Sequence, residues 1–108
     1  FLKSKNIRYY EHTHFTDIIS EADIIYMTRV QKERFTDPIE YEKVKNVYIL
    51  KKKMLKNTKP TMKILHPLPR VNEIHPDVDA SPHAYYFTQA LNGVFTREAI
   101  ISHIMGVK

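Results

Sequence analysis

The chain has no cysteine, which excludes a disulfide framework, a thiol nucleophile and a zinc site with thiolate ligands. It has only 2 glycines, too few for a glycine-rich loop of the kind that cradles phosphate groups. No apolar run approaches the ~18 residues of a membrane span, and the first residues do not form a signal-peptide pattern. From these absences we expect a cytoplasmic protein with no membrane partner.

The composition is that of one globular domain with a basic surface. Of the 108 residues, 43% are hydrophobic and 27% are charged, and the net charge is +5. A basic balance favours anionic ligands, which include nucleic acids as well as small phosphates and carboxylates. The lysines cluster at positions 51–53, 56 and 59 without interleaved aromatic residues, a pattern more typical of a solvated helix face than of a nucleic-acid interface. We therefore expect no nucleic-acid partner.

Two near-continuous apolar runs, residues 24–28 and 62–65, predict strands buried on both faces, as in parallel sheets covered by helices. A segment rich in tyrosine and isoleucine, residues 7–12, predicts a further strand. The remaining elements expected are short helices over 16–22 and 51–57, a helical turn over 40–44, a short strand over 47–50 and a long amphipathic helix from position 83 or 84. The resulting fold class is α/β, with a parallel, Rossmann-like sheet.

The strand over 62–65 ends in a loop with two prolines, Pro67 and Pro69. Each proline fixes its own φ angle, lacks a backbone N–H group and favours an extended preceding residue, so we expect His66 and Leu68 to be extended. The carbonyl groups around Leu68 then lie outside helix and sheet hydrogen bonding. Ligands of open α/β sheets bind at the carboxyl ends of the strands, so this loop is a candidate binding loop. The alternative is a simple proline-rich turn.

Polar side chains follow both apolar strands, and loops at one edge of a sheet can face each other. Arginine forms paired hydrogen bonds with carboxylate or phosphate, glutamine adds a donor and an acceptor, and free carbonyl groups accept from N–H donors. Such a site suits an anionic ligand that also carries N–H groups; the alternative is a surface loop with weak ion pairs. The residues expected to converge are Arg29, Gln31, Lys32, Arg34 and Arg70, with Glu33 orienting one of the arginines.

The sequence offers no motif for metal or proton-transfer chemistry. His12 and His14 are spaced for one face of a strand, but no further ligand lies nearby, and the other histidines lack metal-ligand spacing. No Gly-x-Ser-x-Gly motif occurs, and no pair of carboxylates stands out as general acid and base. We therefore predict a binding site without a metal or a cofactor.

Two long motifs resemble the catalytic chains of aspartate carbamoyltransferase. Residues 26–35, with the sequence YMTRVQKERF, are similar to the aspartate loop of that family, and residues 65–74, LHPLPRVNEI, to its second motif. The related ornithine carbamoyltransferases carry a cysteine in the loop that matches Pro67 and a different loop around Arg29, which favours the aspartate branch. The resemblance covers essentially the whole chain, since it continues in the same order through residues 77–79, 82–87 and 92–95.

The resemblance implies a role for individual residues. Arg29 and Gln31 would bind aspartate. The family also often has an aspartate where this chain has Asn72, so a charged partner for loop closure is lost here. The backbone that would hold carbamoyl phosphate is that of Pro67, Leu68 and Pro69. The residues that would brace the aspartate loop in its closed form are Glu33, Arg34 and Tyr41.

The activity implied by the resemblance is transfer of the carbamoyl group from carbamoyl phosphate to L-aspartate, an early step of de novo pyrimidine biosynthesis. It would be carried out by a homotrimer of catalytic chains, with or without regulatory chains. Residues 1–108 would be part of the aspartate/ornithine-binding domain, truncated at the N-terminus, without the N-terminal carbamoyl phosphate-binding domain and its Ser-Thr-Arg-Thr motif. We therefore expect no activity from the isolated chain. The alternatives are a non-catalytic dicarboxylate-binding module and an ornithine-type relative.

Overall fold

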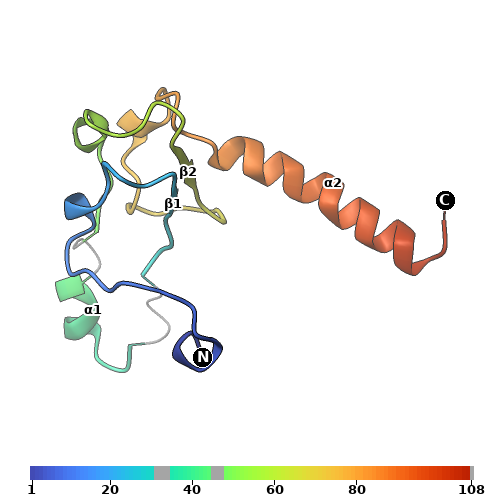
Figure 1. The fold of residues 1–108 in the computed structure, drawn as a ribbon, viewed down its shortest axis with the longest axis horizontal. Helices are drawn as coiled ribbons and strands as arrows, with labels where there is room; N and C mark the ends of the chain where they lie inside the picture. The colour runs from blue at the N-terminus through green and yellow to red at the C-terminus, as the bar shows by residue number, and fades with distance from the viewer. Residues whose placement is uncertain (31–34, 45–47, 108) are drawn as a thin grey trace.

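The computed structural model describes residues 1–30, 35–44 and 48–107. In this part of the chain, short strands and α-helices are joined by irregular segments and single turns of 3-10 helix (Figure 1). The strands are β1 (Ile24–Tyr26) and β2 (Lys63–Leu65), and the helices are α1 (Pro38–Val44) and α2 (Tyr86–Ile104). The 3-10 turns lie at Lys3–Lys5, Phe15–Asp17, Lys52–Leu55 and Pro76–Val78.

β1 and β2 pair in parallel, which confirms the prediction made from the two apolar runs. Ile25 lies opposite Ile64, and the amide of Met27 continues the ladder by donating to the carbonyl of Leu65 at 2.9 Å. Ile64 is fully buried, and β2 has a neighbour on each edge: β1 on one side and an isolated parallel bridge to Ala84 on the other. β2 is therefore the inner strand of this small sheet.

β1 differs from the prediction that it is buried on both faces. Ile24 is 61% exposed and Tyr26 is 56% exposed. Within the described residues, β1 pairs only with β2, and no strand lies along its other edge. An apolar run indicates what a strand is able to bury, whereas its actual burial requires an element that covers it.

The core lies where β2 meets segments from later in the chain. Leu50 joins Ile74 in a single parallel bridge, and its backbone groups bond to those of Glu73 and His75. The strand predicted over 47–50 is thus one bridge in its described residues, and Val47 lies outside them. Burial of each large apolar side chain contributes about 1.5–3 kcal/mol. The fully buried apolar residues are Leu50, Met62, Ile64, Ile74, Val78 and Tyr86.

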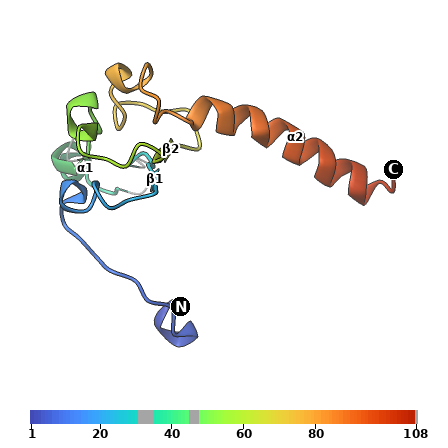
Figure 2. The ribbon, with the colours of Figure 1, turned by 45° about the horizontal axis from the view of Figure 1, so that its top comes forward.

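The N-terminal segment departs most from the sequence prediction. Residues 7–12 are exposed and form no strand, and Figure 2 shows them running away from the sheet towards the N-terminus. The chain leaves its first 3-10 turn at Asn6, which has a left-handed conformation with φ 52°. High β-propensity is not sufficient here, because a strand needs a pairing edge and residues 7–12 have none in the described part. The helix expected over 16–22 is shortened to the turn at Phe15–Asp17.

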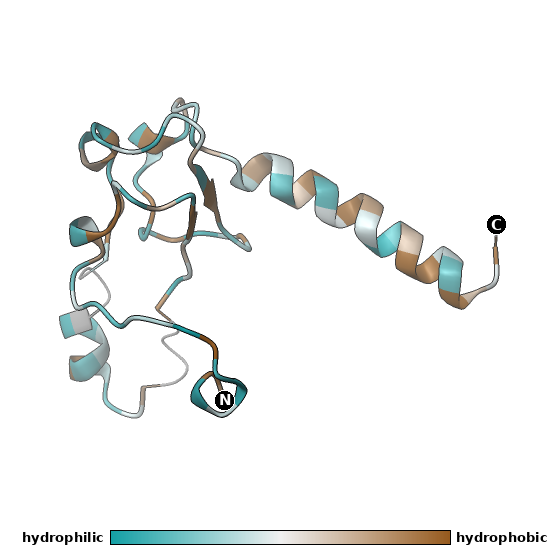
Figure 3. Cartoon of the chain, in the orientation of Figure 1, coloured by the Kyte–Doolittle hydropathy of each residue, from teal (hydrophilic) through white to brown (hydrophobic). Residues whose placement is uncertain are grey.

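α2 confirms the long C-terminal helix, and it runs away from the rest of the chain (Figures 1 and 2). The radius of gyration of 17.1 Å therefore exceeds the ~13 Å of a typical 100-residue domain. Apolar residues recur along α2, as Figure 3 shows, and most of those beyond Tyr86 are exposed. Among the described residues, no helix combines the length and the apolar character needed to cross a membrane. The exposed apolar residues of α2 include Phe87, Leu91, Val94, Phe95 and Ile101.

Candidate functional site

A pocket of about 300 Å³ lies at the carboxyl edge of the parallel pair. β1 and β2 end opposite each other, with Tyr26 paired to Leu65, so the loops that follow the two strands emerge side by side. The first loop contributes Thr28 and Arg29 to the pocket, and the second contributes residues 66–69. The structure thus brings the arginine of one predicted loop to the proline loop of the other. The lining residues are Thr28, Arg29, His66, Pro67, Leu68 and Pro69.

The proline loop turns more sharply than the sequence predicts. Leu68 has φ 46°, in the left-handed region, and the peptide bond between Leu68 and Pro69 is cis, so the prediction of an extended Leu68 is wrong. The physical reason is local, because the amide of Leu68 donates to Nδ1 of His66 at 2.8 Å and folds the loop back on itself. Within the described residues, the carbonyl groups of Pro67 and Leu68 accept no hydrogen bond, which leaves them available to a ligand.

A buried histidine and a buried glutamate hold this loop from within. His66 is 1% exposed and Glu73 is 4% exposed, and Nε2 of His66 lies 2.6 Å from Oε1 of Glu73. The other carboxylate oxygen accepts from the amides of Val71 and Asn72, at 3.1 and 3.0 Å. Burial alone raises the pKa of Glu73, but the backbone amides and His66 more than offset it, so the pKa lies below its usual value. Glu73 is therefore a carboxylate at neutral pH.

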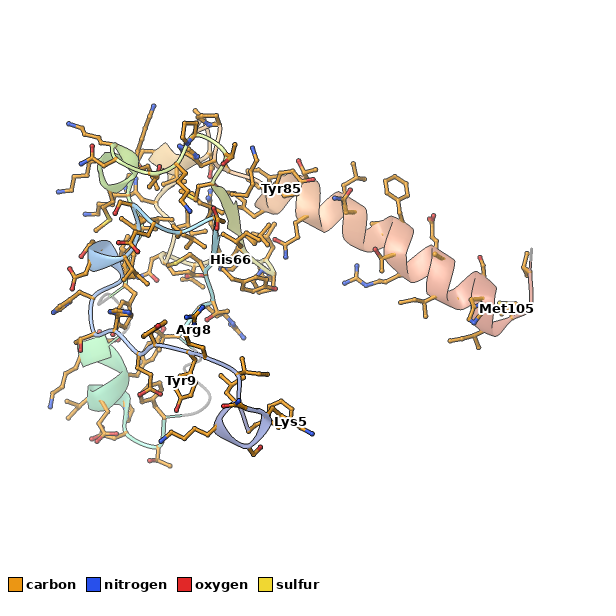
Figure 4. All side chains as sticks on the ribbon, in the orientation of Figure 1. Lys5, Arg8, Tyr9, His66, Tyr85 and Met105 are labelled. Carbon is orange, nitrogen blue, oxygen red and sulfur yellow. The ribbon has the colours of Figure 1, made fainter. Side chains whose placement is uncertain are left out.

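His66 is also held through its backbone. Its amide donates to Oε1 of Gln89, a residue of α2, at 2.9 Å. Figure 4 places His66 beside the strands, where the loop begins. Glu73 and Gln89 were not predicted to contribute to the site. They lie 7 and 23 residues from His66, and neither spacing is typical of a known motif.

Arg70 does not converge on the pocket, so this part of the prediction is wrong. Its guanidinium group forms a paired contact with the carboxylate of Asp79, including one of 2.6 Å from Nη2 to Oδ2. The hydroxyl of Tyr86 donates to the same carboxylate and lies 3.3 Å from Nη1 of Arg70. The contact with Arg70, opposed by burial and reinforced by Tyr86, lowers the pKa of Asp79. Arg70 thus joins the proline loop to the start of α2.

The remaining predicted residues divide into two groups. Tyr41 lies on α1, half-buried, with its ring packed edge-on against Phe35 at a centroid distance of 5.8 Å, and it does not line the pocket. The structure therefore places Arg29, Pro67, Leu68 and Pro69 together and Tyr41 elsewhere. The predicted residues that lie outside the described part of the chain are Gln31, Lys32, Glu33 and Arg34.

These features define an α/β protein segment with a ligand pocket at the carboxyl ends of two parallel strands, where such folds bind their ligands. The pocket is lined by Arg29 and by Pro67 and Leu68, whose carbonyl groups accept no hydrogen bond within the described residues. Residues 2–104 match the family described as Aspartate/ornithine carbamoyltransferase, Asp/Orn binding domain. The chain belongs to this family.

Individual relatives and solved structures agree with this assignment. The aspartate carbamoyltransferase catalytic subunit of Bacteroides thetaiotaomicron is 63% identical over 108 residues, covering 99% of this chain and 34% of the relative. The catalytic subunit of M. jannaschii aspartate transcarbamoylase superposes with a TM-score of 0.85 at 45% identity, covering 99% of this chain and 35% of the other. Aspartate transcarbamoylase from Trypanosoma cruzi, solved with carbamoyl phosphate, gives a TM-score of 0.78 at 32% identity, with coverages of 93% and 32%. The chain thus spans about a third of the length of these relatives.

Proposed function

We propose that this chain supplies the aspartate-binding part of an aspartate carbamoyltransferase. The enzyme transfers the carbamoyl group of carbamoyl phosphate to the amine of L-aspartate in pyrimidine biosynthesis. The observation that carries the proposal is the pocket lined both by Arg29 and by Pro67 and Leu68, whose carbonyl groups accept no hydrogen bond within the described residues. Arginine is suited to a carboxylate of aspartate, and carbonyl groups are suited to the N–H donors of the carbamoyl group and the amine.

In this reaction the amine nitrogen of aspartate attacks the carbamoyl carbon and the bond from that carbon to the phosphate oxygen breaks. Phosphate leaves, and the amine loses a proton. The residues of this chain contribute by positioning the substrates. Arg29 holds a carboxylate of aspartate, and the carbonyl groups of Pro67 and Leu68 accept hydrogen bonds from the carbamoyl NH2 group and the amine of aspartate. Further roles in the proposal are contact with aspartate by Gln31, backbone contact with carbamoyl phosphate by Pro69, and loop closure by Glu33, Arg34 and Tyr41.

The names of the relatives favour this function over the alternatives. The relatives described above are aspartate, not ornithine, carbamoyltransferases, and the T. cruzi enzyme was solved with carbamoyl phosphate. The proposal places the carbamoyl phosphate-binding domain in the part of the relatives that this chain does not match. The complete enzyme is then a homotrimer of catalytic chains in the cytoplasm. An isolated chain of 108 residues should not turn over substrate, because it holds only one side of the site.

A hybrid chain tests the proposal. In it, these 108 residues replace the matching segment of the Bacteroides thetaiotaomicron catalytic subunit. We expect carbamoylation of aspartate by the hybrid chain, and a fall in kcat/KM for aspartate of about 100-fold in Arg29→Ala, since a charge-assisted pair contributes about 1.5–3 kcal/mol. Arg8→Ala is the matched control, because it removes an exposed arginine that does not line the pocket.

The outcomes separate the alternatives. A folded hybrid chain that binds aspartate without turnover would support the non-catalytic dicarboxylate-binding module. Carbamoylation of ornithine in preference to aspartate would support the ornithine-type relative. Equal losses in Arg29→Ala and Arg8→Ala would show that Arg29 has no specific contact with aspartate.

A further inference from the structure

We propose that His66, held by Glu73 and Gln89, is a positioning residue that aims the carbonyl group of Pro67 at the carbamoyl group. This inference rests on the proposed function, because it assigns a role in that same site. His66 makes no proton-transfer step in the proposal. It acts through the backbone of the loop that follows it.

The ring of His66 contacts the backbone of the proline loop directly. Nδ1 of His66 accepts a hydrogen bond from the amide of Leu68 at 2.8 Å. This amide belongs to the peptide unit between Pro67 and Leu68, which is trans and planar, so its N–H and C=O bonds point in opposite directions. By fixing the N–H bond, the ring fixes the direction of the Pro67 carbonyl group. Pro67 lines the pocket, and its carbonyl group accepts no hydrogen bond within the described residues.

The hydrogen bonds of the His66 ring define its tautomer. Because Nδ1 accepts from Leu68, it carries no proton, and the proton of the neutral ring is on Nε2. Nε2 then donates to Oε1 of Glu73 at 2.6 Å. Glu73 is an ionised acceptor at neutral pH, since hydrogen bonds from its own backbone amide, from the amides of Val71 and Asn72 and from His66 outweigh the effect of burial and lower its pKa. Glu73 thus selects the tautomer in which Nδ1 is free to accept.

The proline loop is also anchored to α2. The amide of His66 donates to Oε1 of Gln89 at 2.9 Å, and Gln89 lies in the first turns of α2. The backbone of His66 is therefore fixed by α2 while its ring is fixed by Glu73. Both buried side chains of the pair have their polar atoms satisfied within the described residues. Positioning of this kind matters, because a displacement of about 1 Å in a reacting group lowers rates by about 100-fold.

Two nearly isosteric variants of the hybrid chain separate the contacts of the His66 ring. In His66→Asn, the side-chain oxygen can occupy the place of Nδ1 and still accept from Leu68, while the contact with Glu73 is lost. In His66→Gln, the side-chain amide can reach Glu73, while the acceptor for Leu68 is lost. The readouts are equilibrium binding of carbamoyl phosphate and of inorganic phosphate, which has no N–H group to meet the Pro67 carbonyl. Circular dichroism and the oligomeric state monitor folding.

We expect His66→Gln to bind carbamoyl phosphate about tenfold more weakly, the equivalent of one lost hydrogen bond, with inorganic phosphate within about twofold of the parent. His66→Asn should retain most of the affinity for carbamoyl phosphate. If His66→Gln does not fold, Gln89→Leu applies the same test at a half-buried position of α2. Its expected result is about threefold weaker binding of carbamoyl phosphate alone.

Three results would overturn the inference. One is that His66→Gln folds and keeps the parent's preference for carbamoyl phosphate over phosphate. Where His66→Gln does not fold, the same result for Gln89→Leu overturns the inference. Another is an equal loss for both ligands, which would show a purely structural role. In either case the parent hybrid chain still prefers carbamoyl phosphate, so the proposed function stands. The third is a folded parent without that preference, which would overturn the proposed function and the inference together.

Discussion

The hydroxyl group of Tyr86 should make the stability of this protein fall in alkaline solution. Tyr86 is fully buried, and its hydroxyl donates to Asp79 and accepts from Arg70. Burial, and then the contact with the Asp79 carboxylate, raise the pKa of Tyr86 from its usual 10.0 to about 12, against an opposing effect of Arg70. The folded state therefore keeps a proton that the unfolded state loses. This contribution to stability is complete below about pH 10 and is lost as the pH rises through the folded pKa.

The size of the effect follows from the same contacts. A difference of about two pKa units between the folded and unfolded states corresponds to about 2.7 kcal/mol. Tyr86→Phe removes the ionising group, so the variant lacks this alkaline loss. At neutral pH the variant should be less stable by about 1–2 kcal/mol, because Asp79 loses one donor and keeps Arg70. The stability difference between parent and variant should thus shrink above about pH 10 and vanish before pH 12 is reached.

Denaturant unfolding of the hybrid chain and its Tyr86→Phe variant, at about pH 8 and about pH 11, measures this difference. Tyr85→Phe is the matched control, because it removes a hydroxyl group from the preceding residue and leaves the contact between Arg70 and Asp79 in place. Comparison with the parent cancels the ionisation of the other tyrosines and the lysines. A stability difference for Tyr86→Phe that is the same at both pH values, or larger at the higher one, would refute the reasoning.

Further substitutions in the hybrid chain test other contacts. Asp79→Asn should lower the free energy of unfolding by about 2–3 kcal/mol at neutral pH, less than for a fully buried pair. Because the folded pKa of Asp79 is lowered, this contribution is present above about pH 4 and lost as the pH falls through the folded value, which acid-range denaturant curves would show. Ile64→Ala, in the buried centre of β2, should cost about 2–5 kcal/mol, whereas Ile24→Ala on exposed β1 should cost under about 1 kcal/mol, as thermal unfolding would show. Gly93→Ala should stabilise α2 by about 1 kcal/mol, measured by hydrogen exchange, since the added Cβ meets only the movable guanidinium group of Arg97, with Nη1 at 3.0 Å and Cζ at 3.8 Å.

The sequence carried enough information for the parts of the fold that depend on local pattern. The apolar runs over 24–28 and 62–65 predicted two parallel strands, and the amphipathic stretch near the C-terminus predicted α2. Parallel strands end at a common edge, so the meeting of Arg29 with the proline loop could also be expected from the positions of the two runs. The binding roles of these residues stay predictions.

The predictions that failed are those in which a contact with another residue, near or far along the chain, decides the outcome. Residues 7–12 have the composition of a strand, but no pairing edge lies beside them in the described part. Leu68 was expected to be extended because a proline follows it, and the acceptor on His66 instead draws its amide into a turn. Arg70 lies in a motif rich in anion-binding chemistry, yet Asp79, nine residues further on, takes its guanidinium group.

The contrast between Arg70 and His66 shows why a motif gives the chemistry of a site more readily than its geometry. Both residues lie in the same loop, and sequence reasoning assigned the arginine to the ligand and gave the histidine no role. The structure differs on both residues. The guanidinium group of Arg70 is paired with Asp79, whereas His66 is held by Glu73 and accepts a backbone hydrogen bond on its other ring nitrogen. In each case the partner is an ionised carboxylate, which forms strong hydrogen bonds with the donor that faces it. The direction of the acceptors in the pocket therefore depends on residues outside the pocket wall.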